Sequence, residues 1–145
     1  MKVKKSIKHL LVELISAVFV LLFVYAALSK ILDFEKFRVE LGKSPILNAF
    51  TYYVSVGIPL LEILIAMLLT LKKFQHIALY ASFTMMVMFS AYIVAILNFS
   101  SYIPCTCGGI LEKMNWTQHL IFNMVFIILG IIGVLIYPDE RPYLQ

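Results

Sequence analysis

The sequence predicts an all-α membrane protein, a bundle of four transmembrane helices with one short amphipathic helix between the first and second spans. Hydrophobic residues make up 62% of its 145 residues, charged residues make up 14%, and the mean hydropathy is +0.95. Soluble domains are closer to half apolar and a quarter charged. Four apolar runs each reach the length of about 20 residues that a spanning helix requires. The whole chain, residues 1–145, is therefore expected to form a single transmembrane domain.

The four spans are separated by shorter, more polar segments. Four lysines within the first eight residues precede the first span, as basic residues also precede a signal peptide. The apolar run behind them is longer than a signal-peptide core of about 7–15 residues, so we interpret it as a retained transmembrane helix. The spans are expected over about residues 10–28, 52–71, 77–97 and 117–137.

The segment between the first two spans, about residues 29–51, has the pattern of a short helix. Its apolar residues recur near helical spacing with charged residues between them, which is typical of an amphipathic helix lying in the membrane interface. Gly42 and Pro45 follow, as they often follow the end of a helix. This segment is either a connection that packs against the bundle or a lid over a site at the outer face. Its apolar positions are Ile31, Leu32, Phe34, Phe37 and Leu41.

The distribution of basic residues predicts the orientation. An even number of spans places both termini and the loop between the second and third spans on one side, which then carries seven of the twelve Lys and Arg residues. Cytoplasmic loops are enriched in these residues. We therefore predict a multi-pass protein of the bacterial inner membrane, with both termini cytoplasmic and the loop after the third span periplasmic. The net charge of +4 then reflects topology and contact with membrane lipid, and nucleic acid is not an expected partner.

Both cysteines of the chain lie in that outer loop, in the stretch "YIPCTCGGILEKMNWTQHLIFN". A bridge between Cys105 and Cys107 is feasible only if the backbone turns, and it is expected to be strained, because disulfide Cα atoms usually lie about 4.4–6.8 Å apart. Pro104 and the following Gly108-Gly109 supply residues that favour turns. Such a bridge closes too small a loop to stabilise the fold much. Strained bridges are easily reduced, so reversible redox chemistry explains the pair better than structural stapling.

Two other interpretations of the cysteine pair stay open. Thiolates bind soft metals such as Cu(I) and Zn(II), and His119 and Met114 are available to complete a ligand set, although no metal site is assigned. The pair can also be two ordinary loop cysteines. In a bacterium, the outer face is the oxidising side of the membrane, where disulfides form and persist.

Three polar or aromatic residues of the fourth span share one helical face. Trp116, His119 and Asn123 stand at positions i, i+3 and i+7. An interfacial aromatic belt accounts for the tryptophan, and interhelical hydrogen bonding is the preferred explanation for Asn123. His119 lies within reach of the loop that carries the thiols. It is a candidate to stabilise a thiolate, relay a proton or donate a hydrogen bond to a quinone carbonyl.

Glu62 stands about ten residues into the second span, near the middle of the membrane. A carboxyl group at this depth is a functional-site hypothesis by default. Ser29 and Lys30, at the outer end of the first span, are possible partners, and Lys30 would have to extend its side chain inward. Pro59 precedes Glu62 by one helical turn and leaves a backbone carbonyl without its usual helical partner.

These motifs together resemble a known family. The stretches "YAALSKILDFEKF", "SPIL" and "GIPLLEILIAMLL" resemble the DoxX-like membrane proteins, and "PCTCGG" followed by "WTQHLIFN" resembles their MauE branch, the methylamine-utilisation proteins. The resemblance implies a four-helix, redox-associated integral membrane protein. It also implies that Cys105 and Cys107 are the redox pair. Some of the DoxX-like proteins are linked to quinones, which implies a quinone as a possible electron carrier. Four further residues match motif positions of the family: Lys30, Glu62, Trp116 and Asn123.

The sequence therefore favours a thiol–disulfide oxidoreductase that exchanges disulfides with a periplasmic partner protein through a mixed disulfide. It contains no haem-attachment motif and no dinucleotide fingerprint, so no covalently bound cofactor is expected and a membrane quinone is the natural electron carrier. The competing hypotheses are a non-enzymatic subunit that anchors or assembles a membrane complex, and a copper- or zinc-binding membrane protein.

Overall fold

The computed structural model describes residues 2–101 and 115–138, with side chains from residue 6 onward. This part of the chain is helical and contains no strand. Its elements are α1 (Lys2–Leu32), α2 (Phe34–Lys43), the short 3-10 helix η1 (Asn48–Phe50), α3 (Thr51–Thr70), α4 (Gln75–Phe99) and α5 (Trp116–Ile136).

Four of these helices are long and apolar enough to cross a membrane, which confirms the predicted fold class. The spans cover residues 6–32, 48–70, 75–99 and 116–136. The predicted first span was too short at both ends, since α1 runs from Lys2 to Leu32. Lysine is a good helix former and neither Gly nor Pro interrupts this stretch, so the helix continues through the basic residues that flank the apolar run.

The predicted amphipathic helix is α2. It buries Phe37 and Leu41 against the bundle, whereas Arg38 and Val39 between them are exposed. The helix ends at Lys43, one residue beyond the glycine that the sequence indicated as its stop. Ser44 is extended, with φ −72° and ψ 124°. This ending follows from the next residue, Pro45, because a residue before proline is disfavoured in the helical conformation.

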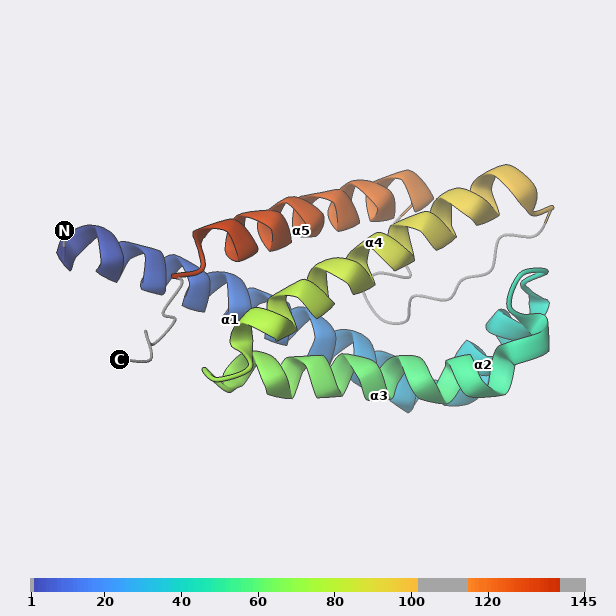
Figure 1. Cartoon of the computed structure of the whole chain (residues 1–145). Coiled ribbons are helices and arrows are strands. Elements are labelled where there is room, and N and C mark those ends of the chain that lie inside the picture. Colours follow the sequence, from blue (N-terminus) through green and yellow to red (C-terminus); the bar gives the residue numbers. More distant parts are fainter. Residues whose placement is uncertain (1, 102–114, 139–145) are drawn as a thin grey trace.

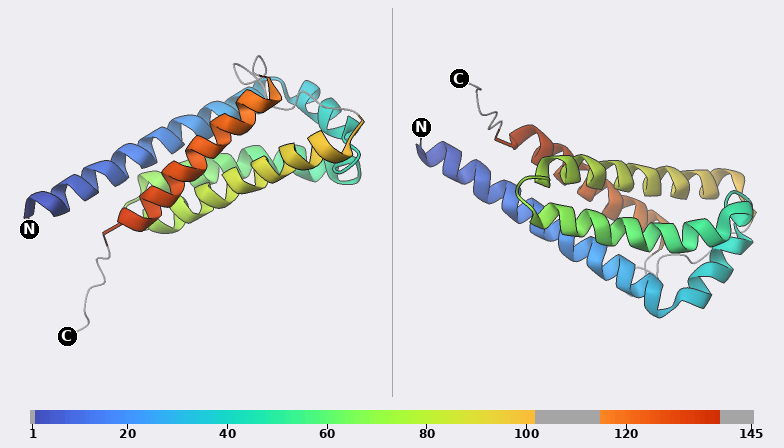
Figure 2. Two further views of the ribbon diagram at one scale, coloured as in Figure 1. Left: turned by 90° about the horizontal axis from the view of Figure 1, so that it is seen from above. Right: turned by 60° about the horizontal axis from the view of Figure 1, so that its bottom comes forward.

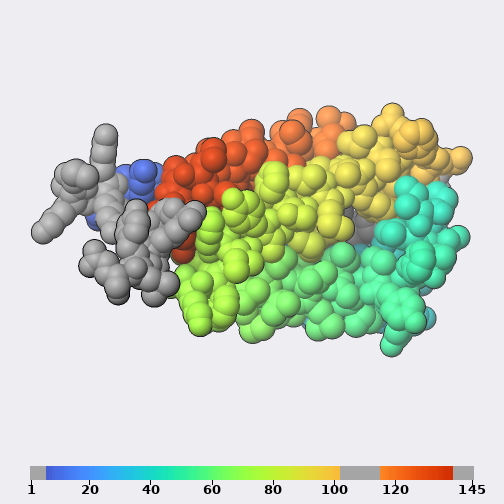
Figure 3. All heavy atoms as spheres, in the orientation of Figure 1, coloured from blue at the N-terminus to red at the C-terminus, as the bar shows by residue number. Residues whose placement is uncertain are grey.

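The four long helices form a ring in the order α1, α3, α4, α5 (Figures 1 and 2). Helix α1 packs most extensively against α3, and α4 against α5, so the bundle consists of two tight pairs that meet along a looser seam. The start of α1, the α3–α4 turn and the end of α5 lie at one end of the bundle, and α2 lies at the other. Figure 3 shows α2 beside the end of α4 on the surface.

The core is aromatic and aliphatic. Phe19 and Phe23 of α1 are completely or almost completely buried, and the ring of Phe126 in α5 meets Phe19 edge-on at 5.4 Å between centroids. Two glycines let α5 approach its neighbours closely. A Cβ atom at Gly130 would lie 3.3 Å from the Cβ atom of Phe83, and one at Gly133 would lie 3.2 Å from a methyl group of Ile15. Small residues allow such close packing of membrane helices.

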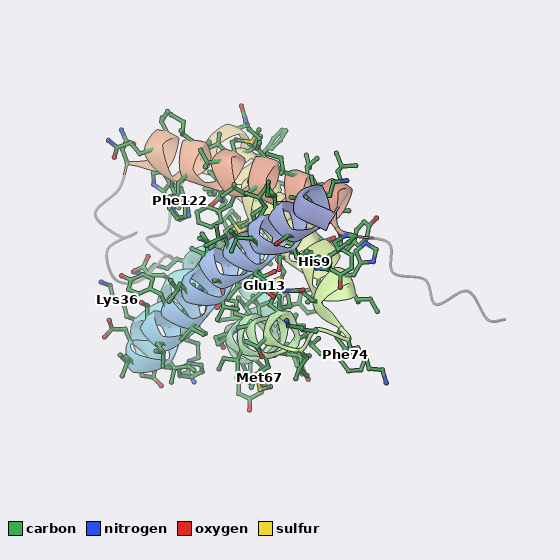
Figure 4. All side chains as sticks on the ribbon, turned by 90° about the vertical axis from the view of Figure 1, so that its left-hand side faces the viewer. His9, Glu13, Lys36, Met67, Phe74 and Phe122 are labelled. Carbon is green, nitrogen blue, oxygen red and sulfur yellow. The ribbon has the colours of Figure 1, made fainter. Side chains whose placement is uncertain are left out.

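Two polar contacts join α1 to the α3–α4 turn and the start of α4. The ammonium of Lys72 lies 3.0 Å from a carboxylate oxygen of Glu13, and the amide of Gln75 donates a hydrogen bond to Ser16 at 3.1 Å. Figure 4 views the bundle from this end, with Glu13 labelled on α1 and Phe74 on the turn. These contacts keep the turn at the same end as the start of α1, as four antiparallel spans require.

Candidate functional site: a cavity between the two helix pairs

A buried ion pair links α1 to α3. The Nζ atom of Lys30 donates to Oε1 of Glu62 at 2.9 Å, with 12% of the lysine side chain and none of the glutamate side chain exposed. The sequence indicated Lys30 as a possible partner of this carboxylate if it extended inward, and the structure confirms that contact. An ion pair removed from water in this way needs further hydrogen bonds to offset the lost hydration of both groups.

Lys30 extends inward because of its position on α1. Side chains on an α-helix tilt toward the N-terminus of that helix, which for α1 is the direction from its α2 end into the bundle. The ammonium accordingly also donates to the carbonyl of Ala26, one turn earlier, at 3.3 Å. It lies 5.9 Å from the ring centroids of both Phe37 in α2 and Phe89 in α4. These rings present their faces to the cation at the outer limit of a cation–π contact.

The start of α5 is fixed by its capping residues. Asn115 is extended, with φ −63° and ψ 149°, and its backbone N–H donates to the side-chain oxygen of Gln118 at 3.0 Å. The backbone N–H of Gln118 donates in return to the Asn115 side chain, so the two residues form a capping box that sets the rotation of the first turn. Trp116 and His119 then stack with ring planes 11° apart and centroids 6.4 Å apart. Because α5 begins here, Asn123 lies one turn further into the bundle on the same face.

These residues surround a cavity of about 270 Å³ in the half of the bundle next to α2. All five described residues that the sequence assigned to a supporting role line it: Lys30 and Glu62 on one helix pair, and Trp116, His119 and Asn123 on the other. The spacing argument for a shared face of α5 is thus confirmed. The remaining walls are almost entirely apolar or aromatic: Leu22, Phe23, Ala26, Phe37, Leu41, Leu47, Val54, Ile58, Met85, Met86, Met88, Phe89, Tyr92, Phe122 and Ile93.

Helix α2 covers one end of this cavity. Phe37 and Leu41, the two side chains that α2 buries, both line it. The segment after α2 is tied to α4, because the hydroxyl of Tyr92 donates to Oγ of the fully buried Ser44 at 3.1 Å. Two interpretations of the segment between the first two spans were open, a packed connection and a lid over a site. The geometry is compatible with both. The Tyr92–Ser44 contact was not predicted from the sequence, because it depends on how α4 meets the chain behind α2.

Two buried polar atoms on the cavity walls have no hydrogen-bond partner among the described residues: Oε2 of Glu62 and Nδ2 of Asn123. The interhelical hydrogen bond preferred for Asn123 is therefore not made by its amide nitrogen. Buried polar groups in native structures are almost always paired with protein or ordered water. One unpaired acceptor and one unpaired donor lie on opposite walls of the cavity. The cavity is therefore a candidate binding site for a ligand that carries polar groups.

The methionines of α4 also belong to the site. Met85, Met86 and Met88 cover several faces of α4, a spacing that by itself indicates ordinary helical packing. Met85 and Met86 are buried as packing requires, but all three side chains line the cavity, and Met88 is 57% exposed. A wall residue that is also exposed on the bundle surface indicates that the cavity is not sealed from the surroundings.

Cys105 and Cys107, assigned as the catalytic pair, lie outside the described residues, as does Met114 of the alternative metal set. The chain that carries them joins Ser101, after the end of α4, to Asn115, at the start of α5. Within the described ranges, no group of three or more His, Cys, Asp or Glu side chains is placed to hold a metal ion.

Comparison with known proteins gives one match. A family model described as "Methylamine utilisation protein MauE" matches residues 8–136, which is most of the chain and includes nearly all of the first span and the whole of the other three. No curated protein and no solved structure matches the sequence.

Proposed function

This chain belongs to the MauE family, and we propose that it is a membrane thiol–disulfide redox protein whose Cys105–Cys107 pair exchanges disulfides with a partner protein. The observation that carries the proposal is the cavity lined by Lys30, Glu62 and His119, which lies in the half of the bundle where α4 ends and α5 begins. The cysteines stand in the chain between those two helix ends. A dithiol that passes electrons onward needs an acceptor nearby, and an apolar cavity with few polar groups is a suitable site for a small carrier.

The proposed exchange proceeds through a mixed disulfide. A thiolate of the pair attacks a sulfur of the partner's disulfide, the second thiolate then displaces the partner, and the partner leaves as a dithiol. The reverse sequence oxidises the partner. When the Cys105–Cys107 pair is regenerated by oxidation, two electrons and two protons leave it, and a membrane quinone accepts both as it becomes a hydroquinone.

We further propose that the protein resides in a bacterial inner membrane with both termini cytoplasmic. Lys72 is 84% exposed in the α3–α4 turn, and the turn shares its end of the bundle with the start of α1, where the lysine-rich N-terminus begins. Concentration of basic residues at one end of a bundle supports a cytoplasmic assignment for that end. The opposite end, where α4 and α5 meet the cysteine-bearing segment, is then periplasmic and oxidising.

The test is the redox state of the cysteine pair in intact membranes. Thiols are trapped with a mass-adding alkylating reagent after equilibration in glutathione buffers of graded potential. We expect a reversible two-electron transition within the range of about −120 to −270 mV that thiol oxidoreductases occupy. Two thiols that stay reduced at every potential would contradict the proposal and favour an assembly subunit. Thiols that react only after a chelator is added would contradict it in favour of a metal site.

A further inference from the structure

The unpaired atoms of the cavity come from opposite helix pairs and differ in hydrogen-bonding character. Oε2 of Glu62, on α3, belongs to a carboxylate that Lys30 holds through the other oxygen, so it can only accept a hydrogen bond. Nδ2 of Asn123, on α5, can only donate one. Both side chains are at least nine-tenths buried, with exposed fractions of 0% and 2%. A guest that satisfies both atoms must therefore offer a donor and an acceptor.

We propose that this cavity binds a single-ring hydroquinone, the reduced form of a lipid-soluble two-electron carrier, and prefers it to the quinone. In this arrangement a phenolic O–H of the guest donates to Oε2 of Glu62, and a guest oxygen accepts from Nδ2 of Asn123. The inference rests on the proposed function for the source of the electrons. It goes beyond that function by naming the binding atoms and the redox form that the site selects.

The preference follows from what each redox form can offer. The oxygens of a quinone are carbonyls, which accept hydrogen bonds and cannot donate them. A quinone therefore pairs with Asn123 but leaves the fully buried Glu62 oxygen without a partner. A buried polar atom that loses its partner changes a binding constant by roughly tenfold to a hundredfold. The hydroquinone, with two hydroxyl groups, leaves neither atom unpaired.

The remaining walls suit a substituted aromatic ring. An apolar cavity of about 150 Å³ accommodates benzene, so the volume of about 270 Å³ found here has room for a ring with substituents. Phe37, Phe89 and Phe122 supply aromatic surface, and aromatic pairs favour stacked or edge-on contacts. An apolar tail has a route outward beside Met88, the wall residue that is 57% exposed.

A site that prefers the reduced carrier also sets the direction of electron flow. Two S–H bonds of the Cys105–Cys107 dithiol are broken and one S–S bond forms, while the quinone takes up two electrons and two protons and gains two O–H bonds. Each tenfold preference for the hydroquinone raises the potential of the bound two-electron couple by about 30 mV. Binding at this cavity therefore favours oxidation of the thiols and reduction of the carrier.

The chain provides its own reporter for the test, because its only tryptophan, Trp116, lines the cavity. Full-length protein carrying Cys105→Ser and Cys107→Ser is reconstituted in lipid nanodiscs under anaerobic conditions, so that the carriers bind but do not react. Decylubiquinone is titrated as the probe and quenches tryptophan emission, and decylubiquinol is then added as a competitor. Oxidised wild-type protein titrated with the quinone shows whether the serine substitutions disturb the site.

We expect saturable quenching, and a dissociation constant for the hydroquinone about tenfold to a hundredfold below that for the quinone. Asn123→Leu should weaken the binding of both the quinone and the hydroquinone by roughly tenfold. Glu62→Gln should remove most of the difference between their two dissociation constants. If Glu62→Gln does not accumulate, Lys30→Met/Glu62→Leu removes the acceptor without leaving a buried lysine unpaired, and the same loss of preference is expected. Gln75→Leu is the matched control: it removes another buried amide, which lies outside the cavity, and should leave both affinities unchanged.

Equal affinities for the two forms, a tighter quinone, or the absence of saturable quenching would each overturn this inference. None of these results bears on the glutathione titration, which contains no carrier. A reversible cysteine transition without carrier binding would leave the thiol–disulfide proposal standing and reject the hydroquinone site. Selective hydroquinone binding beside cysteines that never oxidise would support the site and reject the thiol–disulfide proposal.

Discussion

The ammonium of Lys30 lies 2.9 Å from a carboxylate oxygen of Glu62, although the two residues are 32 positions apart and belong to different membrane spans. The contact fixes the register of α1 against α3, because sliding either helix by one turn would separate the two charges in an apolar environment. It also leaves the second carboxylate oxygen facing a cavity. The pair is thus both a structural link and one wall of the candidate site.

Removing one member of this pair should destabilise the protein strongly. Lys30→Met leaves the carboxylate of Glu62 buried without its cation, at an expected cost of about 3–5 kcal/mol in the free energy of unfolding. Lys30→Met/Glu62→Leu removes both charges and should recover most of that loss. Reversible unfolding in mixed micelles, followed by circular dichroism, measures both variants.

An exposed ion pair provides the comparison. Arg38 lies 3.5 Å from Glu35 on the outer face of α2, with 46% and 75% of their side chains exposed. Arg38→Met should change the unfolding free energy by about 0–1 kcal/mol, since exposed pairs contribute little. A loss at Arg38 equal to that at Lys30 would show that burial is not what makes the Lys30–Glu62 contact important.

The covering role of α2 predicts a change in access to the cavity. Phe37→Ala removes a buried ring from the wall, so water-soluble iodide should quench the emission of Trp116 more strongly than in the wild type. Val39→Ala, on the same helix but 51% exposed, should leave the quenching constant unchanged. Equal quenching in the two variants would count against a cover and in favour of a merely connecting segment.

The different surroundings of Gly130 in α5 and Gly57 in α3 predict opposite effects for two glycine substitutions. Gly130→Leu places its side chain against Phe83, whose Cβ atom would lie only 3.3 Å from the added Cβ atom, and overpacking should cost about 1–3 kcal/mol. Gly57→Ala adds a methyl group where nothing lies within 4 Å, and it should stabilise α3 by about 0.5–1 kcal/mol. Thermal unfolding of the purified variants measures both, and a destabilising Gly57→Ala would contradict the assigned packing.

The proposed orientation predicts which residues an impermeant thiol reagent reaches from outside. In intact bacteria treated with a reductant, Cys105 and Cys107 should be labelled. Lys72→Cys, in a background with both native cysteines changed to serine, should be labelled only after the membrane is permeabilised. The side chain of Lys72 is 84% exposed, so a failure to label it would reflect its side of the membrane and not burial in the bundle. Labelling of Lys72→Cys in intact cells would reverse the orientation.

Much of the fold could be predicted because a membrane span depends on the length and hydrophobicity of one contiguous segment. Each apolar run is long enough to specify a helix without reference to its neighbours, and the i, i+3, i+7 spacing correctly gathered Trp116, His119 and Asn123 on one face. Helix ends were less accurate, as at Lys2 and Leu32, because flanking lysines and short polar stretches allow helix without requiring it.

The cavity itself could not be predicted in this way. It depends on which helices pair, on the tilt of Lys30 toward the interior and on the return of α2 over the bundle, and none of these leaves a periodic signal. The methionines illustrate the difficulty. Nothing in the sequence distinguishes Met85, Met86 and Met88 from ordinary core residues. All three line the same cavity only because of the way the two helix pairs meet.

The seam between the α1–α3 pair and the α4–α5 pair has a mechanical consequence. Glu62 stands on one half of the bundle and Asn123 on the other, with the cavity between them. A molecule hydrogen-bonded to both would act as a cross-brace, resisting separation of the halves in a way that neither half provides alone. A ligand bound in the cavity would then make the whole bundle more rigid, and the protein without ligand would be the more flexible of the two states.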